Sequence, residues 1–123
     1  MAFQDYTNLA VWQKAMVLTG MAYELIGKLP KEEQYALAGQ MRRAAVSIPS
    51  NIAEGRGRQT DEEFRRFLYI ARGSCYELNT QFLLCVRFGY LSEEAVSPIL
   101  AAGEEVGRML TALILTLSTT AKS

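Results

Sequence analysis

Residues 40–58, with the sequence QMRRAAVSIPSNIAEGRGR, constrain the fold more than any other stretch of the chain. At helical spacing they have an apolar face at i, i+4, i+7 and i+11, which comprises Met41, Ala45, Ile48 and Ile52. The other face is entirely polar and comprises Arg43, Ser47, Ser50, Asn51, Glu54 and Arg58. Because Pro49 has no N–H, we expect a helix that kinks there and whose freed carbonyl accepts hydrogen bonds from Ser or Asn side chains or from water. Gly55 and Gly57 are expected to end this helix.

The same helical periodicity continues through most of the chain, and no segment shows the two-residue alternation of a strand. We expect helices at residues 8–27, 32–54, 61–88 and 98–117. Their end signals are Asn8 as an N-cap, the pair Leu29-Pro30, a capping box that begins at Thr60, and Pro98 in a first turn. The connections are short, which favours antiparallel neighbours. A chain of 123 residues is expected to form one domain, here an all-α, antiparallel, up-down-up-down four-helix bundle.

Each expected helix has one apolar face that would be buried. For residues 8–27 the spacing selects Leu9, Trp12, Met16, Thr19, Tyr23 and Ile26. For residues 32–54 it adds Leu37 to the four apolar residues named above. For residues 61–88 it selects Phe64, Phe67, Leu68, Ala71, Cys75, Leu78, Phe82 and Cys85, and for residues 98–117 it selects Ile99, Ala102, Val106, Leu110, Leu113 and Leu117. Residues 1–7 are expected to be a short arm from which Phe3 and Tyr6 pack on the bundle.

Three motifs carry a resemblance to a known family. They are RRAAVSIPSNIAEGRGR at residues 42–58, FRRFLYIARGS at residues 64–74 and LAVWQKA at residues 9–15. Together they resemble the signature of the four-helix-bundle proteins encoded in intervening sequences of bacterial 23S rRNA genes, a family whose biochemical role is poorly defined. The chain is also similar to the accessory proteins of diversity-generating retroelements, which share the bundle, form five-fold rings and bind nucleic acid. This resemblance implies a closed homo-oligomeric ring, with a pentamer favoured.

Composition excludes several kinds of chemistry. The chain has no histidine, so the commonest general base, the commonest zinc ligand and the triads that depend on histidine are absent. Cys75 and Cys85 lie ten residues apart on one expected helix, about 15 Å along its axis, which is too far for a disulfide within that helix. We expect both to be buried thiols in a cytoplasmic protein. The loop at residues 55–59 has two glycines but lacks the P-loop pattern, and the sequence indicates no cofactor, metal, membrane segment or small-molecule substrate.

The arginines are concentrated in the middle of the chain. Thirteen basic residues balance thirteen acidic ones overall, yet residues 42–72 contain seven arginines and only four acids. The seven candidates for RNA binding are Arg42, Arg43, Arg56, Arg58, Arg65, Arg66 and Arg72. Arginine binds phosphate well, and Tyr69 and Tyr76 could stack on bases. The alternative is that Arg43 and Arg72 pair with Glu54 and Glu77 within the protein or between subunits, which the neutral net charge favours. Because a buried arginine without a partner would be costly, Glu54 or Glu77 is expected within hydrogen-bonding reach of Arg43 or Arg72.

A second set of residues is predicted to form a subunit interface. It comprises Arg43, Ser47, Asn51, Glu54, Tyr69, Arg72 and Tyr76. Tyrosine and arginine are enriched in protein interfaces, and small residues such as Ala44, Ser47 and Gly73 would let helices approach closely. The sequence therefore predicts a non-enzymatic, homo-oligomeric bundle that acts as an interaction scaffold, with an RNA-binding accessory protein as the alternative.

Overall fold

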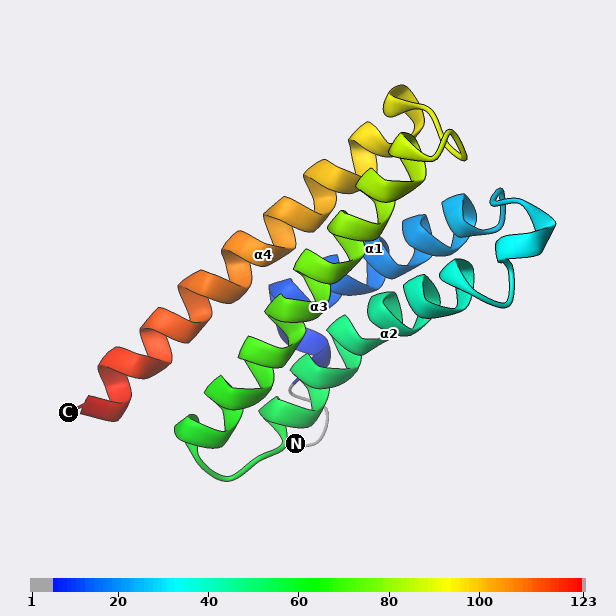
Figure 1. Cartoon of the computed structure of the whole chain (residues 1–123). Coiled ribbons are helices and arrows are strands. Elements are labelled where there is room, and N and C mark those ends of the chain that lie inside the picture. The colour runs from blue at the N-terminus through cyan, green and yellow to red at the C-terminus, as the bar shows by residue number, and fades with distance from the viewer. Residues whose placement is uncertain (1–5, 123) are drawn as a thin grey trace.

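Four long helices make up the computed structural model, which describes residues 6–122 (Figure 1). They are α1 (Ala10–Ile26), α2 (Leu37–Arg56), α3 (Asp61–Arg87) and α4 (Glu93–Lys122), with a short 3-10 helix, η2 (Lys31–Glu33), between α1 and α2. No strand occurs among the described residues. The packing order is α1–α2–α3–α4 and back to α1, so α1 lies diagonally opposite α3, and α2 opposite α4. The predicted all-α four-helix bundle is confirmed.

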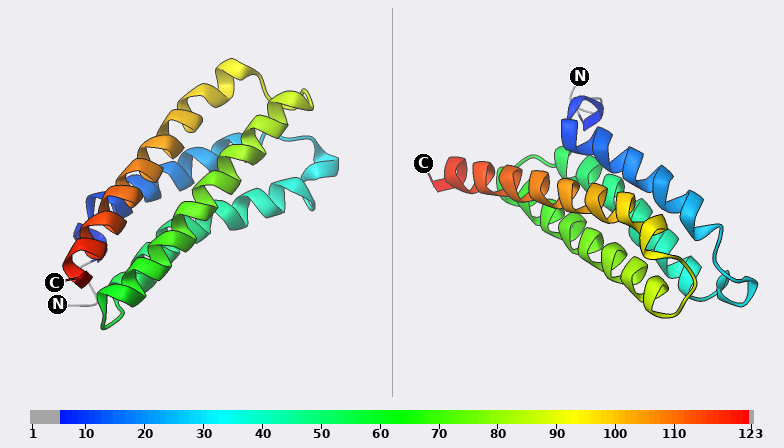
Figure 2. Two further views of the ribbon diagram at one scale, coloured as in Figure 1. Left: turned by 60° about the vertical axis from the view of Figure 1, so that its left-hand side comes forward. Right: turned by 90° about the horizontal axis from the view of Figure 1, so that it is seen from above.

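Successive helices run in opposite directions, because each connection joins neighbours at one end of the bundle. The start of α1, the turn between α2 and α3, and the end of α4 all lie at the same end (Figure 2). The connections that contain η2 and that join α3 to α4 lie at the other end (Figure 1). A consequence for function is that the α1/α2 side and the α3/α4 side are opposite faces of one protomer.

The buried faces of α2 and α3 are the ones that the spacing predicts. All four apolar residues of the α2 stripe are fully buried, and so are all eight selected on α3, or nearly so. On α4, Ile99, Val106 and Leu110 are buried as expected, whereas Ala102, Leu113 and Leu117 are only partly buried and pack against the core. The packing is close where α2 meets α3: a Cβ at Gly55 would lie 2.6 Å from Phe67 Cβ.

The predicted face of α1 is wrong. The structure buries Val11, Ala15, Leu18 and Ala22, together with the predicted Ile26. Of the predicted set only Ile26 is fully buried, while Met16 and Tyr23 are almost half exposed. The observed stripe is rotated by about one residue, roughly 100°, because both faces of α1 are apolar and the spacing alone does not choose between them.

Several helix ends also differ from the predicted ones. Helix α4 begins at Glu93 rather than near Pro98, because the Ser92 hydroxyl accepts a hydrogen bond from the Ala95 N–H (3.0 Å) and caps it. Pro98 therefore lies in the second turn, beside an exposed Glu94 whose carbonyl it leaves without a helical donor. Helix α1 has Leu9 as its N-cap without a side-chain bond, so Asn8 does not cap it.

The other two differences concern α2 and the N-terminal arm. Helix α2 begins at Leu37, because residues 31–36 wind as η2 and a turn, and at its far end Gly55 does not stop it, since the C-cap is Gly57. Tyr6 packs edge-on against Trp12, with ring centroids 5.4 Å apart, as expected for the arm. Phe3 lies outside the described residues.

Pro49 lies inside α2, which continues through it without a break, as predicted. The carbonyl that Pro49 deprives of a donor is that of Ala45, four residues earlier. It accepts a hydrogen bond from the Thr19 hydroxyl of α1 (3.1 Å). The compensating group is therefore a threonine of the neighbouring helix rather than the predicted Ser or Asn side chain. The kink at Pro49 stays a prediction.

Candidate interaction surfaces

A polar seam runs between α2 and α3. The Ser47 and Ser74 hydroxyls lie 2.9 Å apart and share a hydrogen bond across the two helices. Asn51 donates to both the carbonyl (2.8 Å) and the hydroxyl (2.9 Å) of Ser47. The polar groups of Ser47 and Asn51, predicted to contact another subunit, thus have partners within the protomer.

Arg43 and Glu77 line a shallow hollow of about 450 Å³ above this seam, together with Gln40, Ala44 and the two serines. The sequence predicted that Arg43 or Arg72 would lie within hydrogen-bonding reach of Glu54 or Glu77. Among the described residues none of these four pairings forms. Glu54 instead accepts from Arg58 (3.0 Å), and Glu77 accepts from Gln81 (3.3 Å). Arg43 and Glu77 line one hollow and form no hydrogen bond or ion pair with each other.

Three arginines gather around two phenylalanines at the turn between α2 and α3. Arg56 lies over the Phe64 ring (5.9 Å), while Arg58 and Arg66 both lie over Phe67 (4.8 Å each). Cation–π contacts of this kind hold guanidinium groups against an apolar surface.

Acids offset the charge at this turn. Arg58 pairs with Glu54, and Arg66 pairs with Glu63 (3.2 Å), which lowers the pKa of Glu63. Thr60 accepts from the Glu63 N–H (3.1 Å), which confirms the predicted cap, whereas the Glu63 carboxylate turns to Arg66 rather than back to the cap. Within the protomer the ion pairs are those of Arg58 and Arg66 and not the predicted ones of Arg43 and Arg72.

Arg72 belongs to the other side of α3. Its guanidinium lies over the rings of Tyr69 (4.9 Å) and Tyr76 (5.9 Å) and donates to the Thr111 hydroxyl of α4 (3.1 Å). About half of each tyrosine side chain is exposed. Arg65 lies seven residues before Arg72, two turns along the same stripe of α3, and its Nη1 is buried without a hydrogen-bond partner among the described residues.

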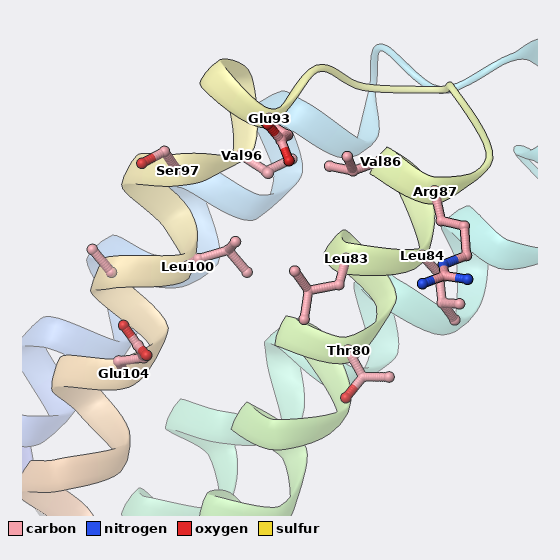
Figure 3. A pocket seen from close by; sticks show the side chains of 11 residues that line it. Thr80, Leu83, Leu84, Val86, Arg87, Glu93, Val96, Ser97, Leu100 and Glu104 are labelled. Carbon is pink, nitrogen blue, oxygen red and sulfur yellow. The ribbon is translucent and has the colours of Figure 1, made fainter.

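The α3/α4 side is hollowed along much of its length. One part of the groove, of about 740 Å³, lies near the connection between the helices, where Leu83 and Leu100 point into the space between them (Figure 3). A second part, of about 570 Å³, lies farther toward the other end and is lined by Tyr76, Gly107 and Leu115 among others. Glu104 lines both parts, so they adjoin at this residue, and we refer to the two together as the α3/α4 groove. Its lining is mainly apolar, which is typical of surfaces that bind a partner.

The predicted site residues therefore fall on separate surfaces. Arg42 lies on the α1/α2 side, over the Tyr23 ring of α1 (5.9 Å). Arg43, Ser47 and Asn51 belong to the α2/α3 seam, and Arg56, Arg58 and Arg66 to the adjoining turn. Tyr69, Arg72 and Tyr76 belong to the α3/α4 side, with Arg65 on their stripe. The structure does not bring the seven arginines together on one face.

Several exposed apolar residues were not predicted as part of any site. Leu83 is one, although it continues the stripe of Tyr69 and Tyr76 at a spacing of seven residues. Met16 and Val17 on α1 and Val46 on α2 are others. The regular spacing of Leu83 was a signal in the sequence, whereas the exposed face of α1 could be recognised only once its buried face was known.

The two cysteines are buried and free, as predicted. Burial raises the pKa of the Cys75 thiol to about 12 and that of Cys85 to about 11, so neither is a ready nucleophile near neutral pH. The described residues contain no group of three or more Cys, Asp or Glu side chains placed to hold a metal ion. Within the same residues, no helix is both long and apolar enough to cross a membrane.

Comparison with known proteins identifies the family but not an activity. No curated protein matches the chain. A crystal structure of a protein of unknown function from the S23 ribosomal protein family of Bacteroides thetaiotaomicron superposes with a TM-score of 0.77, at 22% sequence identity, over 85% of this chain and 98% of that one. The sequence model of the 23S rRNA-intervening sequence proteins matches residues 7–112. The chain belongs to the 23S rRNA-intervening sequence protein family.

Proposed function

We propose that this protein is a homo-oligomeric α-helical scaffold without catalytic activity, which acts through contacts between copies and with other macromolecules. The observation that carries the proposal is the α3/α4 groove, flanked by the half-exposed Tyr69, Tyr76 and Leu83. A monomer has no need to leave so continuous an apolar and aromatic surface in water, and aromatic residues are enriched where proteins associate.

The interface proposed here contains fewer residues than the one predicted from the sequence. Tyr69, Arg72 and Tyr76 remain in it, since they flank the groove and are accessible to a neighbour. The Ser47 hydroxyl bonds to Ser74 of α3 and Asn51 donates back to Ser47, so the polar groups of both have partners within the protomer. A ring of five subunits is favoured by the similarity to the accessory proteins of diversity-generating retroelements, a relationship that also belongs to this proposal.

The test is the mass of the protein in solution. Light scattering coupled to gel filtration, at micromolar concentration, is expected to give a multiple of 13.7 kDa, with five copies favoured. A mass of 13.7 kDa across the accessible concentration range would refute the scaffold proposal. A dimer or tetramer would retain the scaffold and remove the ring of five.

The second candidate is an RNA-binding accessory protein, favoured by the stacking of Arg72 between Tyr69 and Tyr76. Such an arrangement presents a cation and two ring faces together, as single-stranded RNA sites do. Against it, part of the arginine charge is already paired with acids, and the net charge is zero.

A salt series distinguishes this candidate from the scaffold. Binding of a single-stranded RNA, followed by fluorescence anisotropy, should weaken steeply with salt if arginines contact phosphate. A variant with Arg42, Arg43, Arg56 and Arg58 replaced by alanine tests the predicted basic residues, and Arg72→Gln tests the stacked site. Binding that is absent at low salt, or that neither variant weakens, would remove RNA binding.

A further inference from the structure

The outer side of the α2/α3 pair carries four exposed charged residues, which define what we call the α2/α3 face: Arg43 and Glu54 on α2, and Arg66 and Glu77 on α3. Arg43 and Glu54 are eleven residues apart, and so are Arg66 and Glu77. A spacing of three helical turns keeps each pair on one stripe of its helix. The face therefore has two charges of each sign and no net charge.

The register of the two helices places Arg43 beside Glu77. Helices α2 and α3 are antiparallel, and the hydrogen bond between the Ser47 and Ser74 hydroxyls (2.9 Å) marks one level that they share. Arg43 lies four residues before Ser47, and Glu77 lies three residues after Ser74. Both are therefore one turn from the shared level in the same direction, and both line the hollow above the polar seam.

Glu54 and Arg66 lie beside each other nearer the turn. The close contact there is between Gly55 and Phe67, since a Cβ at Gly55 would lie 2.6 Å from Phe67 Cβ. Glu54 and Arg66 are the residues just before these two. The sign of the charge therefore alternates in both directions across the α2/α3 face. It is positive then negative along α2, and at the same levels negative then positive on α3.

Such an alternating pattern is complementary to itself. A second copy can be turned about a two-fold axis that lies in the contact and runs parallel to the helices, so that its α2 covers α3 of the first copy. Each arginine then faces a glutamate of the other copy at the same level. Because a two-fold contact is isologous, every such pair forms twice. Opposite charges at matched positions favour this pairing over contacts with unrelated surfaces.

Arg43 and Glu77 have charges that the protomer does not neutralise. Arg43 makes no hydrogen bond or ion pair within the described part of the chain. The Glu77 carboxylate accepts only from the neutral Gln81 side chain there (3.3 Å). Both charged groups are therefore free to bind a partner at small cost.

Glu54 and Arg66 are already paired, but along their own helices and not across the seam. Glu54 accepts from Arg58 (3.0 Å), and Arg66 donates to Glu63 (3.2 Å). Exposed pairs of this kind contribute little, so they do not compete strongly with a partner. Arg58 and Glu63 add one charge of each sign at the turn and leave the face neutral.

We infer that the α2/α3 face is a two-fold contact between two copies of this chain, in which Arg43 of each copy pairs with Glu77 of the other, and Glu54 with Arg66. The inference goes beyond the proposed function, whose groove lies on the α4 side of α3. Ile70 is the only large apolar side chain exposed on this stripe of α3 (42%). The contact therefore depends mainly on charge, so it should form only at higher concentration and weaken with salt.

Charge reversal combined with mixing tests the named pair. A two-fold contact joins only two faces, so the mass of the wild type, measured by light scattering, is expected to double as concentration rises. Arg43→Glu sets two acids against each other at each pair, and Glu77→Arg sets two bases. Each variant alone should therefore pair at least about tenfold more weakly and keep the lower mass over the same range.

An equimolar mixture of the two variants should double in mass again. When an Arg43→Glu copy meets a Glu77→Arg copy, one pair is reversed and the other is native, and both join opposite charges. Variants that double in mass on their own, or a mixture that does not, would overturn the inference. Circular dichroism of each variant checks that the bundle remains folded.

The matched controls are Lys28→Glu and Glu24→Arg. They make the same changes in net charge at exposed positions on and just after α1, and both should double in mass as the wild type does. A wild type that stays at 13.7 kDa at every concentration would overturn the proposed function together with this inference. An oligomer whose mass does not double would overturn the inference alone.

Discussion

Thr19 is expected to stabilise the protein chiefly because Pro49 is present. Its hydroxyl donates to Ala45 of α2, whose carbonyl has no helical donor because residue 49 is a proline. The same hydroxyl lies 2.8 Å from the Ala15 carbonyl, but that carbonyl also receives the Thr19 N–H inside α1. Removing the hydroxyl therefore leaves only the Ala45 carbonyl without a partner.

The magnitude follows from that asymmetry. Thr19→Val keeps the shape of the side chain and should lower the free energy of unfolding by about 1–3 kcal/mol, the usual effect of leaving a buried polar group unpaired. In a Pro49→Ala background, the N–H of the introduced alanine supplies the helical donor, and the same Thr19→Val change should lose less than about 0.5 kcal/mol. The expected coupling between the two positions is therefore about 0.5–3 kcal/mol.

The assay is urea unfolding of the wild type, both single variants and the double variant, followed by helical circular dichroism at one fixed protein concentration. A fixed concentration matters because self-association would shift apparent stability by mass action. The loss of the pyrrolidine ring from the core cancels in this cycle, since it is common to both Pro49→Ala variants. Equal effects of Thr19→Val in the two backgrounds, within about 0.3 kcal/mol, would refute the reasoning, because that is the additivity expected of independent sites.

Two further predictions concern packing and thiol chemistry. Gly55→Ala should lower the free energy of unfolding by about 1–3 kcal/mol, because the new Cβ would lie 2.6 Å from Phe67 Cβ. Gly73→Ala should raise the free energy of unfolding by up to about 1 kcal/mol, because a Cβ there meets nothing within 4 Å. Urea unfolding measures both changes. Cys75 should react with iodoacetamide only after unfolding. Burial raises the pKa of Cys75 from 9.0 to about 12, so the thiol ionises first in the unfolded chain. The free energy of unfolding should therefore be unchanged below pH about 9 and fall above it by up to about 1.4 kcal/mol per pH unit. A Cys75→Ala variant whose free energy of unfolding falls equally above pH about 9 would contradict this.

The fold could be predicted because α2 and α3 each offer one apolar stripe and one polar face. On α2, Met41, Ile48 and Ile52 have no competing apolar line, so burial of any other face would have exposed them. The first residue of α4 was harder to predict. Pro98 is a frequent first-turn residue, yet the cap at Ser92 adds a turn before it, and the tolerance of a second-turn proline depends on solvent at the Glu94 carbonyl.

The sequence predicted which helix carries each candidate site residue, but not on which surface of the bundle that residue lies. Ser74 and Arg72 are two residues apart, which turns their side chains by about 200° around α3. Ser74 accordingly bonds to α2, and Arg72 bonds to α4. The sequence shows that these residues are unusual for a solvated face. It does not show on which side of α3 each neighbouring helix packs, because that depends on whether the bundle turns to the left or to the right.

The wrong face on α1 has a physical cause that bears on assembly. Larger apolar side chains gain more from burial, which favours Met16 and Tyr23 as core residues over Ala15 and Ala22. The structure buries the alanine line with Leu18 between and leaves the larger residues outside. Full burial of a Met or Val side chain contributes about 1.5–3 kcal/mol relative to exposure, and the protomer forgoes this contribution on the outer face of α1. The proposed association of copies would regain part of it if that face were in the contact.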